Sequence, residues 1–424
     1  MKLLLFGTLC IATATWAEPQ EIASSLTLEQ VVDAALHDNA QLRATRAKWE
    51  ATQERPVQER TLPNPMLSVK SGNAVDDFSF PETQETRVEV EQSFPWFGKL
   101  GLKGKVATKD AEVVQREYEA AALDVIMAAK EAYFDLYAVQ RALSITRSEE
   151  DVVRRMETIA EAKYGTGEVS QQDVLKAQAE ITMLRQRLLE LEQRESTLKA
   201  KLNFLMNQPA DSPLGLAVTA PPTEVDPDAA KLFALAEKAR PEIKGAQAEI
   251  ARSEYQRDLM KKEFFPDYRL GVEYGHMDSG FTDFSNSENV LMVTVGIDLP
   301  IWQSKYRAGV REAEKKIEAS EAALQAAQQQ TSFDVQDASF KLLTAQRTLN
   351  LYTKELIPQA EMRFHASESG YRTGKVNFID LLESERFLLN ARIMAAMAEG
   401  NVGMQMARLE RAVGTGVPNM EVKK

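Results

Sequence analysis

One twelve-residue stretch occurs twice in this chain, with the two copies 207 residues apart at residues 164–175 and 371–382. Both follow the pattern Tyr-x-x-Gly-x-Val-[Ser/Asn]-x-x-Asp-[Val/Leu]-Leu. Each copy lies between two long helical patterns. Its glycines supply the backbone conformations that a tight turn needs, and Ser170 or Asn377 is a good N-cap for the returning helix. The sequence therefore predicts two helical hairpins, with turns at residues 164–170 and 370–377.

The rest of the chain is duplicated with the same period. We expect one structural repeat at residues 18–206 and a second at 228–413, with a Pro-, Asp- and Thr-rich linker at 207–227 and a short tail at 414–424. Each repeat reads as a helix, a strand pair, a long helix, a turn and a helix. The first helices are expected at residues 27–60, capped by Thr27, and at 228–264, with a possible kink at Arg240-Pro241.

The long helices exceed the length of a globular helix. From about residue 100 to 163 there is no proline and, past Gly104, no glycine. Some 60 residues of helix would span about 90–95 Å, which indicates coiled-coil packing. Residues 306–369 form the second long helical pattern, and Pro358 is expected to bend it.

Two strand pairs are expected, at residues 66–94 and 268–299. Apolar residues such as Val88 and Val90 alternate with charged ones, and Glu89, Glu91, Glu273 and Asp298 would share a face that avoids lipid. Strands of about 8–11 residues match a tilted membrane strand. Four strands cannot close a barrel, and open edges are not tolerated in lipid. Other subunits must complete the sheet, and three subunits would give twelve strands.

The chain begins with a pattern typical of a secretory signal peptide at residues 1–17, where Met1-Lys2 precedes an apolar run. The only cysteine, Cys10, lies inside it and follows a poor lipoprotein motif, so we expect no disulfide and no lipid anchor. No later segment offers about 18 uncharged apolar residues, so no membrane helix is expected. The net charge of −12 argues against nucleic-acid binding.

Catalytic and cofactor motifs are missing from the sequence. It has no HExxH, no G-x-S-x-G and no Cys-His pair, and the glycine-rich stretch 98–105 lacks the spacing of a P-loop. His37, His276 and His365 are scattered, and the methionines of residues 394–406 lie on an alanine-rich helix where core packing explains them. We expect neither an enzyme nor a cofactor nor a dedicated metal site.

The signal peptide, the duplication and the paired turn motifs together resemble TolC-like outer-membrane efflux proteins. Residues 92–99, Gln-Ser-Phe-Pro-Trp-Phe-Gly-Lys, resemble the heavy-metal (CzcC-like) branch of that family. The resemblance implies a mostly α fold with a membrane β-barrel. A homotrimer would form a 12-stranded barrel in the outer membrane and an α-helical coiled-coil tunnel through the periplasm. It also implies a periplasmic adaptor and an inner-membrane pump, which we expect to be of the RND type.

The resemblance assigns roles to individual residues. Asp380 and Glu383 would line the narrowest ring and attract cations, and Tyr371 would help to latch the closed tip, although Val376 replaces the family's latch arginine. The adaptor would meet the tip turns at Tyr164, Gly165, Gly167, Asp173, Gly370 and Gly374. The strand-to-helix corners would contain Pro95, Trp96, Gly98, Lys99, Pro300 and Trp302, with the tryptophans in an aromatic belt or packed in a corner.

Three interpretations of function remain open at this level. The leading one is a passive outer-membrane duct of a pump–adaptor–channel system for heavy-metal cations. The second keeps the duct but changes its cargo to drugs or to a polypeptide, as in type I secretion. The third is a soluble periplasmic coiled-coil scaffold, against which the alternating strands argue. Likewise, Asp380 and Glu383 could be an ordinary solvated helix N-terminus.

Overall fold

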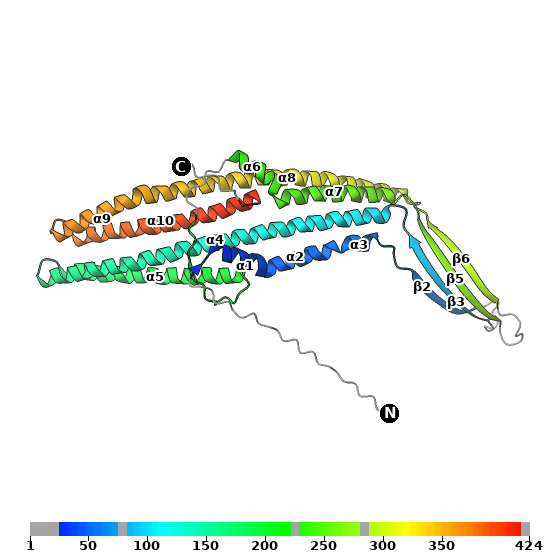
Figure 1. Cartoon of the computed structure of the whole chain (residues 1–424), viewed down its shortest axis with the longest axis horizontal. Helices are drawn as coiled ribbons and strands as arrows, with labels where there is room; N and C mark the ends of the chain where they lie inside the picture. The colour runs from blue at the N-terminus through cyan, green and yellow to red at the C-terminus, as the bar shows by residue number, and fades with distance from the viewer. Residues whose placement is uncertain (1–24, 75–82, 222–228, 280–287, 417–424) are drawn as a thin grey trace, which may run out of the picture.

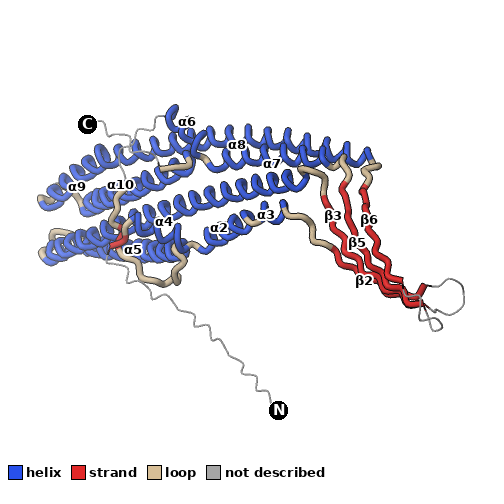
Figure 2. Tube along the Cα trace, turned by 45° about the vertical axis from the view of Figure 1, so that its right-hand side comes forward, coloured by secondary structure: helices blue, strands red, loops and turns tan. Residues whose placement is uncertain are grey.

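The computed structural model describes residues 25–74, 83–221, 229–279 and 288–416. The chain is a long rod of helices with a twisted four-stranded sheet at one end (Figures 1 and 2). The predicted signal peptide lies outside the described residues, as do the last part of the linker (222–227) and the end of the tail.

Both predicted helical hairpins are present. In the first, α4 (Lys99–Gly165) returns through α5 (Gln171–Leu205). In the second, α8 (Gln303–Leu351), a π-helical turn η1 (Tyr352–Leu356) and α9 (Ile357–Arg372) lead to α10 (Phe378–Val413). The π turn lies directly before Pro358, the predicted site of the bend. A proline has no N–H to donate, and such a local change in helix register is a usual way to accommodate it.

The prediction of one helix at residues 27–60 was wrong. Thr27 caps α1 (Leu28–Asp38) as expected, with a capping box to Gln30, but Asn39 leaves the helical conformation at φ −58° and ψ 121°. Its side chain instead caps α2 (Ala40–Gln53), and α3 (Arg55–Arg60) follows with a proline in its first turn. An asparagine side chain that bonds to the nearby backbone competes with helix continuation, and here that local bond prevails.

The second amino-terminal helix is also divided rather than kinked. It consists of α6 (Ala229–Ala239) and α7 (Pro241–Lys262), with Arg240 between them at φ −64° and ψ 123°. Proline sterically drives the preceding residue into an extended conformation, which accounts for the break.

The sheet joins the two repeats. Its strands are β2 (Met66–Ala74), β3 (Thr83–Phe94), β5 (Asp267–Ser279) and β6 (Glu288–Asp298), ordered β2-β3-β5-β6 with every neighbouring pair antiparallel. A second, parallel pair, β1 (Ser25–Leu26) with β4 (Leu216–Ala217), ties the linker region to the start of the first repeat. The two strand pairs predicted from alternation are therefore confirmed, and they form one sheet.

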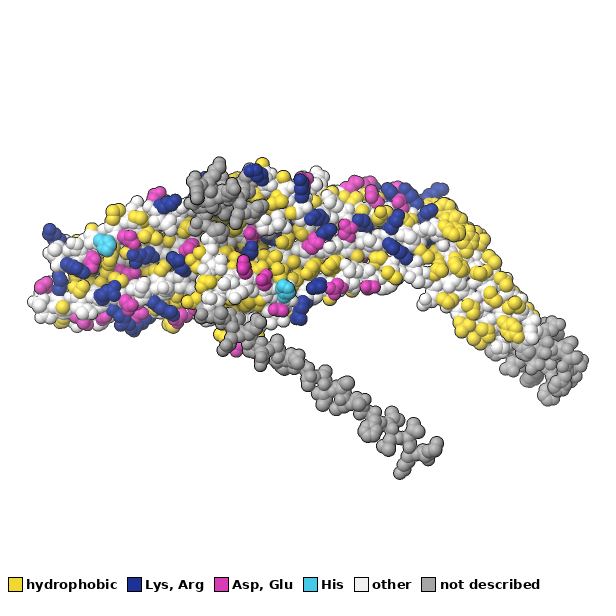
Figure 3. All heavy atoms as spheres, in the orientation of Figure 1, with side chains coloured by type: hydrophobic (Ala, Val, Ile, Leu, Met, Phe, Trp, Pro, Cys, Tyr) yellow, Lys and Arg dark blue, Asp and Glu magenta, His cyan; other side chains and the backbone are white. Residues whose placement is uncertain are grey.

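The two faces of this sheet differ in chemistry. One is apolar and exposed to the surroundings, and Figure 3 shows hydrophobic side chains spread over the strands. Its residues include Leu67, Val69, Val90, Val272, Tyr274, Leu291, Val293, Val295 and Ile297. The other face is charged, with ion pairs Lys70–Glu89, Arg87–Glu273 and Arg269–Asp298. The strand register places the four predicted acidic residues together on this charged face.

Helix α4 is the centre of the rod, because it contacts α1, α2, α3, α5, α7 and α10. Its largest buried side chain, Tyr133, is 0% exposed and uses its hydroxyl twice: it donates to the Leu26 carbonyl at 2.9 Å and accepts from the Thr219 N–H at 2.8 Å. This satisfied buried hydroxyl fixes β1 and β4 against α4. No described helix combines the length and the apolar character needed to cross a membrane.

Candidate functional site

The two hairpin turns lie at the same end of the rod, opposite the sheet (Figure 1). Each closes with the same pattern of backbone hydrogen bonds. The Glu168 N–H donates to the Lys163 carbonyl at 2.9 Å, and the Lys375 N–H donates to the Gly370 carbonyl at 2.8 Å. We call the residues of these two turns, 163–171 and 370–378, the tip.

Three of the four predicted glycines are required by this geometry. Gly167 and Gly374 have φ values of 77° and 73°, a region that favours glycine. Gly370 has no room for a side chain, because an added Cβ would lie 2.4 Å from the Val376 Cγ2 atom. At Gly165 a Cβ would meet nothing within 4 Å, so the structure does not require a glycine there.

The two motif tyrosines have different environments. Tyr164 is 48% exposed, whereas Tyr371 is 4% exposed and packs edge-on against Phe378 at 5.5 Å between ring centres. Burial, together with the negative charges of Asp173 and Glu168, raises the pKa of the Tyr371 hydroxyl. Among the described residues that hydroxyl has no hydrogen-bond partner.

The contact that joins the two turns comes instead from Lys163. Its ammonium group donates to the Tyr371 carbonyl at 3.2 Å and lies 4.9 Å from the centre of the tyrosine ring. Lys163 immediately precedes the first motif, but no feature of the motif predicted this contact. Lys163 therefore makes a polar contact between the two hairpins, close to the position where Val376 replaces the family's latch arginine.

Asp380 and Glu383 are both exposed on the first turns of α10. The Asp380 N–H bonds to the Asn377 Oδ1 atom at 2.9 Å, which fixes the start of the helix, and the i, i+3 spacing puts both carboxylates on one face. Neither forms an ion pair within the described residues. The equivalent Asp173 on α5 differs, because the Lys176 Nζ atom lies 3.4 Å from its Oδ1 atom. Of the two hairpins, the second thus presents two exposed acids without an ion pair among the described residues.

A cluster of three buried glutamates lies behind this exposed pair. Glu149 of α4, Glu180 of α5 and Glu385 of α10 are 3%, 4% and 0% exposed. Arg386 pairs with Glu180, and its Nε atom lies 2.7 Å from the Glu180 Oε2 atom. Burial and the neighbouring Glu149 carboxyl raise the pKa of Glu385 to about 10. The burial of Glu385 could not be predicted from the sequence, because this residue stands in a charged run that is typical of a solvated helix face.

The first predicted strand-to-helix corner is a packed structural joint. Asp267 accepts the Trp96 N–H at 2.7 Å and lies 2.9 Å from the Lys99 Nζ atom, which is nearly completely buried. The Trp96 ring stacks on Phe265 and Tyr268, and Gly98 turns the chain with φ 88°. The second corner is looser: Trp302 is 69% exposed, and the Pro300 carbonyl accepts from Gln303 at 3.2 Å.

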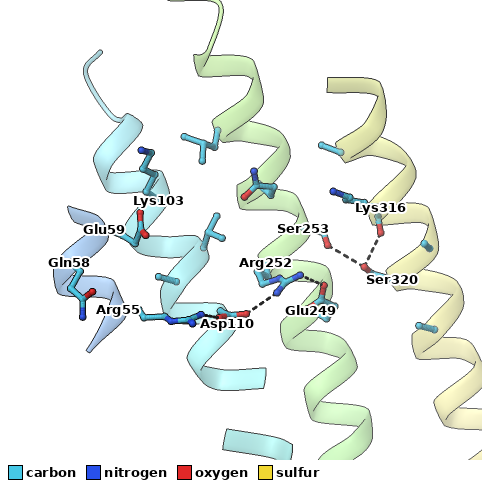
Figure 4. A pocket seen from close by; sticks show the side chains of 17 residues that line it. Arg55, Gln58, Glu59, Lys103, Asp110, Glu249, Arg252, Ser253, Lys316 and Ser320 are labelled. Atoms are coloured by element: carbon cyan, nitrogen blue, oxygen red, sulfur yellow. Dashed lines mark hydrogen bonds and ion pairs between the residues drawn. The ribbon is translucent and has the colours of Figure 1, made fainter. Parts of the chain in front are cut away.

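A groove of about 1020 Å³ lies along the rod between the helices of the two repeats (Figure 4). Asp110 of α4 bridges its walls: one oxygen lies 3.1 Å from Arg55 of α3, and the other lies 2.8 Å from Arg252 of α7. Its lining mixes both signs of charge. No group of three His, Cys, Asp or Glu in the described part of the chain is placed to hold a metal ion.

Comparison with known proteins shows to which family this chain belongs. The profile of the family described as "Outer membrane efflux protein" matches residues 31–208 and 232–415, which is most of the chain and both repeats. The chain belongs to the outer membrane efflux protein family. The resemblance inferred from the paired turns is therefore confirmed, and the fold and family are those of channel proteins rather than of enzymes.

Curated relatives in this family match along nearly the whole chain. The cobalt-zinc-cadmium resistance protein CzcC of Cupriavidus metallidurans is 23% identical over 403 residues, covering 93% of this chain and 92% of that protein. The pyoverdine export outer membrane protein OpmQ of Pseudomonas putida is 21% identical over 412 residues, covering 92% and 86%.

Solved structures show the same fold. The channel CusC superposes with a TM-score of 0.79 at 16% identity, covering 92% of each chain. VceC of Vibrio cholerae gives a TM-score of 0.76 at 19% identity, covering 92% of this chain and 96% of that one. The fold is thus a TolC-like one, and this efflux protein is placed in the outer membrane with its helices extending into the periplasm.

Proposed function

We propose that this chain assembles as a homotrimer and forms the passive outer-membrane duct of a pump–adaptor–channel system that exports heavy-metal cations. One observation carries the proposal. The sheet has two edge strands, β2 and β6, an apolar exposed face and a charged opposite face. Pairing β6 of each copy with β2 of the next would close a twelve-stranded barrel, with the apolar face toward lipid and the charged face toward the lumen.

The tip would form the periplasmic entrance. Threefold symmetry would bring three copies of Asp380 and Glu383 into one ring, where closely spaced carboxylates attract cations. A periplasmic adaptor would dock on the tip turns, and an inner-membrane pump of the RND type would supply the energy. The channel itself would carry out no chemical step.

Two observations of different kinds support a heavy-metal cargo. The relative CzcC, which matches over nearly its full length, is named for cobalt, zinc and cadmium resistance. On this chain, neither acid of the second tip turn forms an ion pair among the described residues, and such a pair favours cations over anions. A second cargo class also has specific support, because OpmQ matches over a comparable length and is named for pyoverdine export.

The test is deletion of the gene in its own host, with complementation by the wild-type gene. Sensitivity restricted to metals such as cobalt, zinc and cadmium, restored by complementation, would support metal export. Sensitivity to dyes and antibiotics, or loss of siderophore release, with unchanged metal tolerance would overturn the metal cargo and leave the duct. Recovery of the protein in the soluble periplasmic fraction, as a monomer, would overturn the duct.

A further inference from the structure

The seam between α4 and α10 has two unlike halves. In the half nearer the sheet, opposite charges meet: Lys130 pairs with Glu410, Glu131 with Arg408 and Asp124 with Arg411, each at 2.5 Å. In the half nearer the tip, Glu385 of α10 faces Glu149 of α4, so that acid meets acid. The pairs of the first half attract whenever their carboxylates are ionised, whereas at the Glu385–Glu149 contact two ionised carboxylates would repel each other.

Glu385 has no donor to stabilise a negative charge. Its side chain is completely buried, and neither carboxylate oxygen receives a hydrogen bond from a donor among the described residues. An ionised carboxylate without partners in such a place is very costly, so the group retains a proton. The neighbouring buried Glu149 carboxyl, which helps to raise the pKa of Glu385, is the natural acceptor of that proton.

The charges around Glu385 do not replace this proton. From α5, Glu180 adds a further negative charge, and Arg386 is committed to Glu180. Arg392 of α10 lies 3.0 Å from Glu361 of α9 and only 3.9 Å from Glu149. Three buried acids therefore face the two guanidinium groups of Arg386 and Arg392, and one of these groups is shared with a fourth acid.

A close contact between the helices separates the two halves of the seam. At Gly400 an added Cβ would lie 2.7 Å from the Phe134 carbonyl oxygen, so α10 touches the α4 backbone closely there. Next to this contact, toward the tip, a cavity of about 550 Å³ lies between α4, α10 and the π-helical turn η1, lined by residues such as Arg141, Thr353 and Ala396. The contact fixes α10 against α4 at this level, and the cavity leaves open space beside α10 on the tip side.

We propose that Glu385 and Glu149 form a proton-operated clamp, in which a shared proton holds the tip half of the second hairpin against the first and its loss drives the two hairpins apart. The clamp would regulate opening of the tip, and in that sense it rests on the proposed duct. The movement itself is a property of the hairpins and can be measured without transport.

The direction of the pH effect follows from linkage. While α10 packs on α4, the pKa of Glu385 is about 10, and once water enters the pKa returns toward its ordinary value of 4.5. Between these values the packed state holds one proton more than the separated state. The ratio of packed to separated hairpins therefore falls by up to about tenfold for each pH unit, and packing is strongest in acid.

The experiment measures the distance between spin labels on the full-length protein. Labels on Thr158→Cys of α4 and Ala366→Cys of α9 occupy exposed positions on opposite hairpins, and the only native cysteine lies in the predicted signal peptide. We expect the population with a long distance to grow between about pH 5 and about pH 9. Glu385→Gln, which keeps the shape but cannot ionise, should hold the short distance throughout.

The matched control is Asp151→Asn, which removes an exposed carboxylate two residues from Glu149 and should keep the wild-type pH response. Glu149→Gln is a second test of the same pair and should also flatten the response. A wild-type distance that does not change with pH, or a Glu385→Gln response equal to wild type, would overturn the clamp. Either result leaves the duct standing, and a failure of the duct in growth tests leaves the distance measurement intact.

Discussion

The ammonium group of Lys163 at the end of α4 donates to the main-chain oxygen of Tyr371 at 3.2 Å and lies 4.9 Å from the centre of its ring. Both partners are largely buried, and they belong to different hairpins. The carbonyl bond and the cation–π contact both come from Lys163, so a single side chain fastens the first turn to the second.

We predict that Lys163→Met weakens this fastening, because methionine fills similar space but provides neither contact. The contact between the two turns should lose about 1–2 kcal/mol of stabilising free energy. Purified protein in planar bilayers should then show a resting conductance several-fold above wild type. Lys375→Met is the control, since this exposed lysine of the second turn has no side-chain partner among the described residues. Equal conductance of the two variants would contradict the role given to Lys163.

The acidic pair of α10 makes a separate prediction about ions. We expect Asp380→Ala combined with Glu383→Ala to lower the block of single-channel conductance by trivalent cations, because a ring of three acidic pairs binds such ions strongly. Glu161→Ala removes an exposed acid near the tip on the first hairpin and should leave the block unchanged. A block that persists in the double variant would reject the ring.

Much of the fold could be predicted because its signals are local. Glycines in the sequence indicate the two turns, and Gly167 and Gly374 have positive φ values in the structure. Alternation in the strands likewise specifies which face is apolar. The break at Asn39 could not be predicted in the same way. It depends on whether one side chain bonds to its own backbone, and the sequence pattern is compatible with either outcome.

The site was only partly accessible to sequence reasoning, for a physical reason. Glu383 and Glu385 stand two positions apart, and a helix turns about 200° over that distance. One carboxylate consequently points outward while the other is completely buried. What decides this is the position of α4, whose Glu149 is far away in the chain. No motif marks such a contact, so only the three-dimensional arrangement reveals the buried pair.

The close contact of α10 with α4 predicts that Gly400→Ala is destabilising. The new Cβ would lie 2.7 Å from the Phe134 carbonyl oxygen and 2.6 Å from the Ala138 Cβ atom, so the helices would have to move apart. We expect the free energy of unfolding to fall by about 1–3 kcal/mol. Thermal unfolding followed by helical circular dichroism is the measurement.

Gly101→Ala provides the comparison for that measurement. It lies in α4, where a Cβ would meet nothing within 4 Å. Alanine is the better helix former by about 1 kcal/mol, so this variant should be neutral or slightly more stable. If both alanine variants unfold at the same temperature, the close contact at Gly400 does not limit the packing of α10.

The strand-to-helix corner predicts that Asp267→Ala is among the costly single changes in the sheet region. Asp267 accepts the Trp96 N–H and neutralises the buried Lys99 ammonium, and Glu263, at 3.4 Å, is the other acid near it. Without Asp267 the Trp96 N–H and the buried Lys99 ammonium are poorly paired, which should lower the free energy of unfolding by about 2–4 kcal/mol. Asp337→Ala, which breaks an exposed i, i+4 pair with Lys341, should cost only about 0.3–0.5 kcal/mol. Thermal unfolding of the two variants is the measurement. Equal decreases in unfolding temperature would show that the corner does not hold the sheet to the helices.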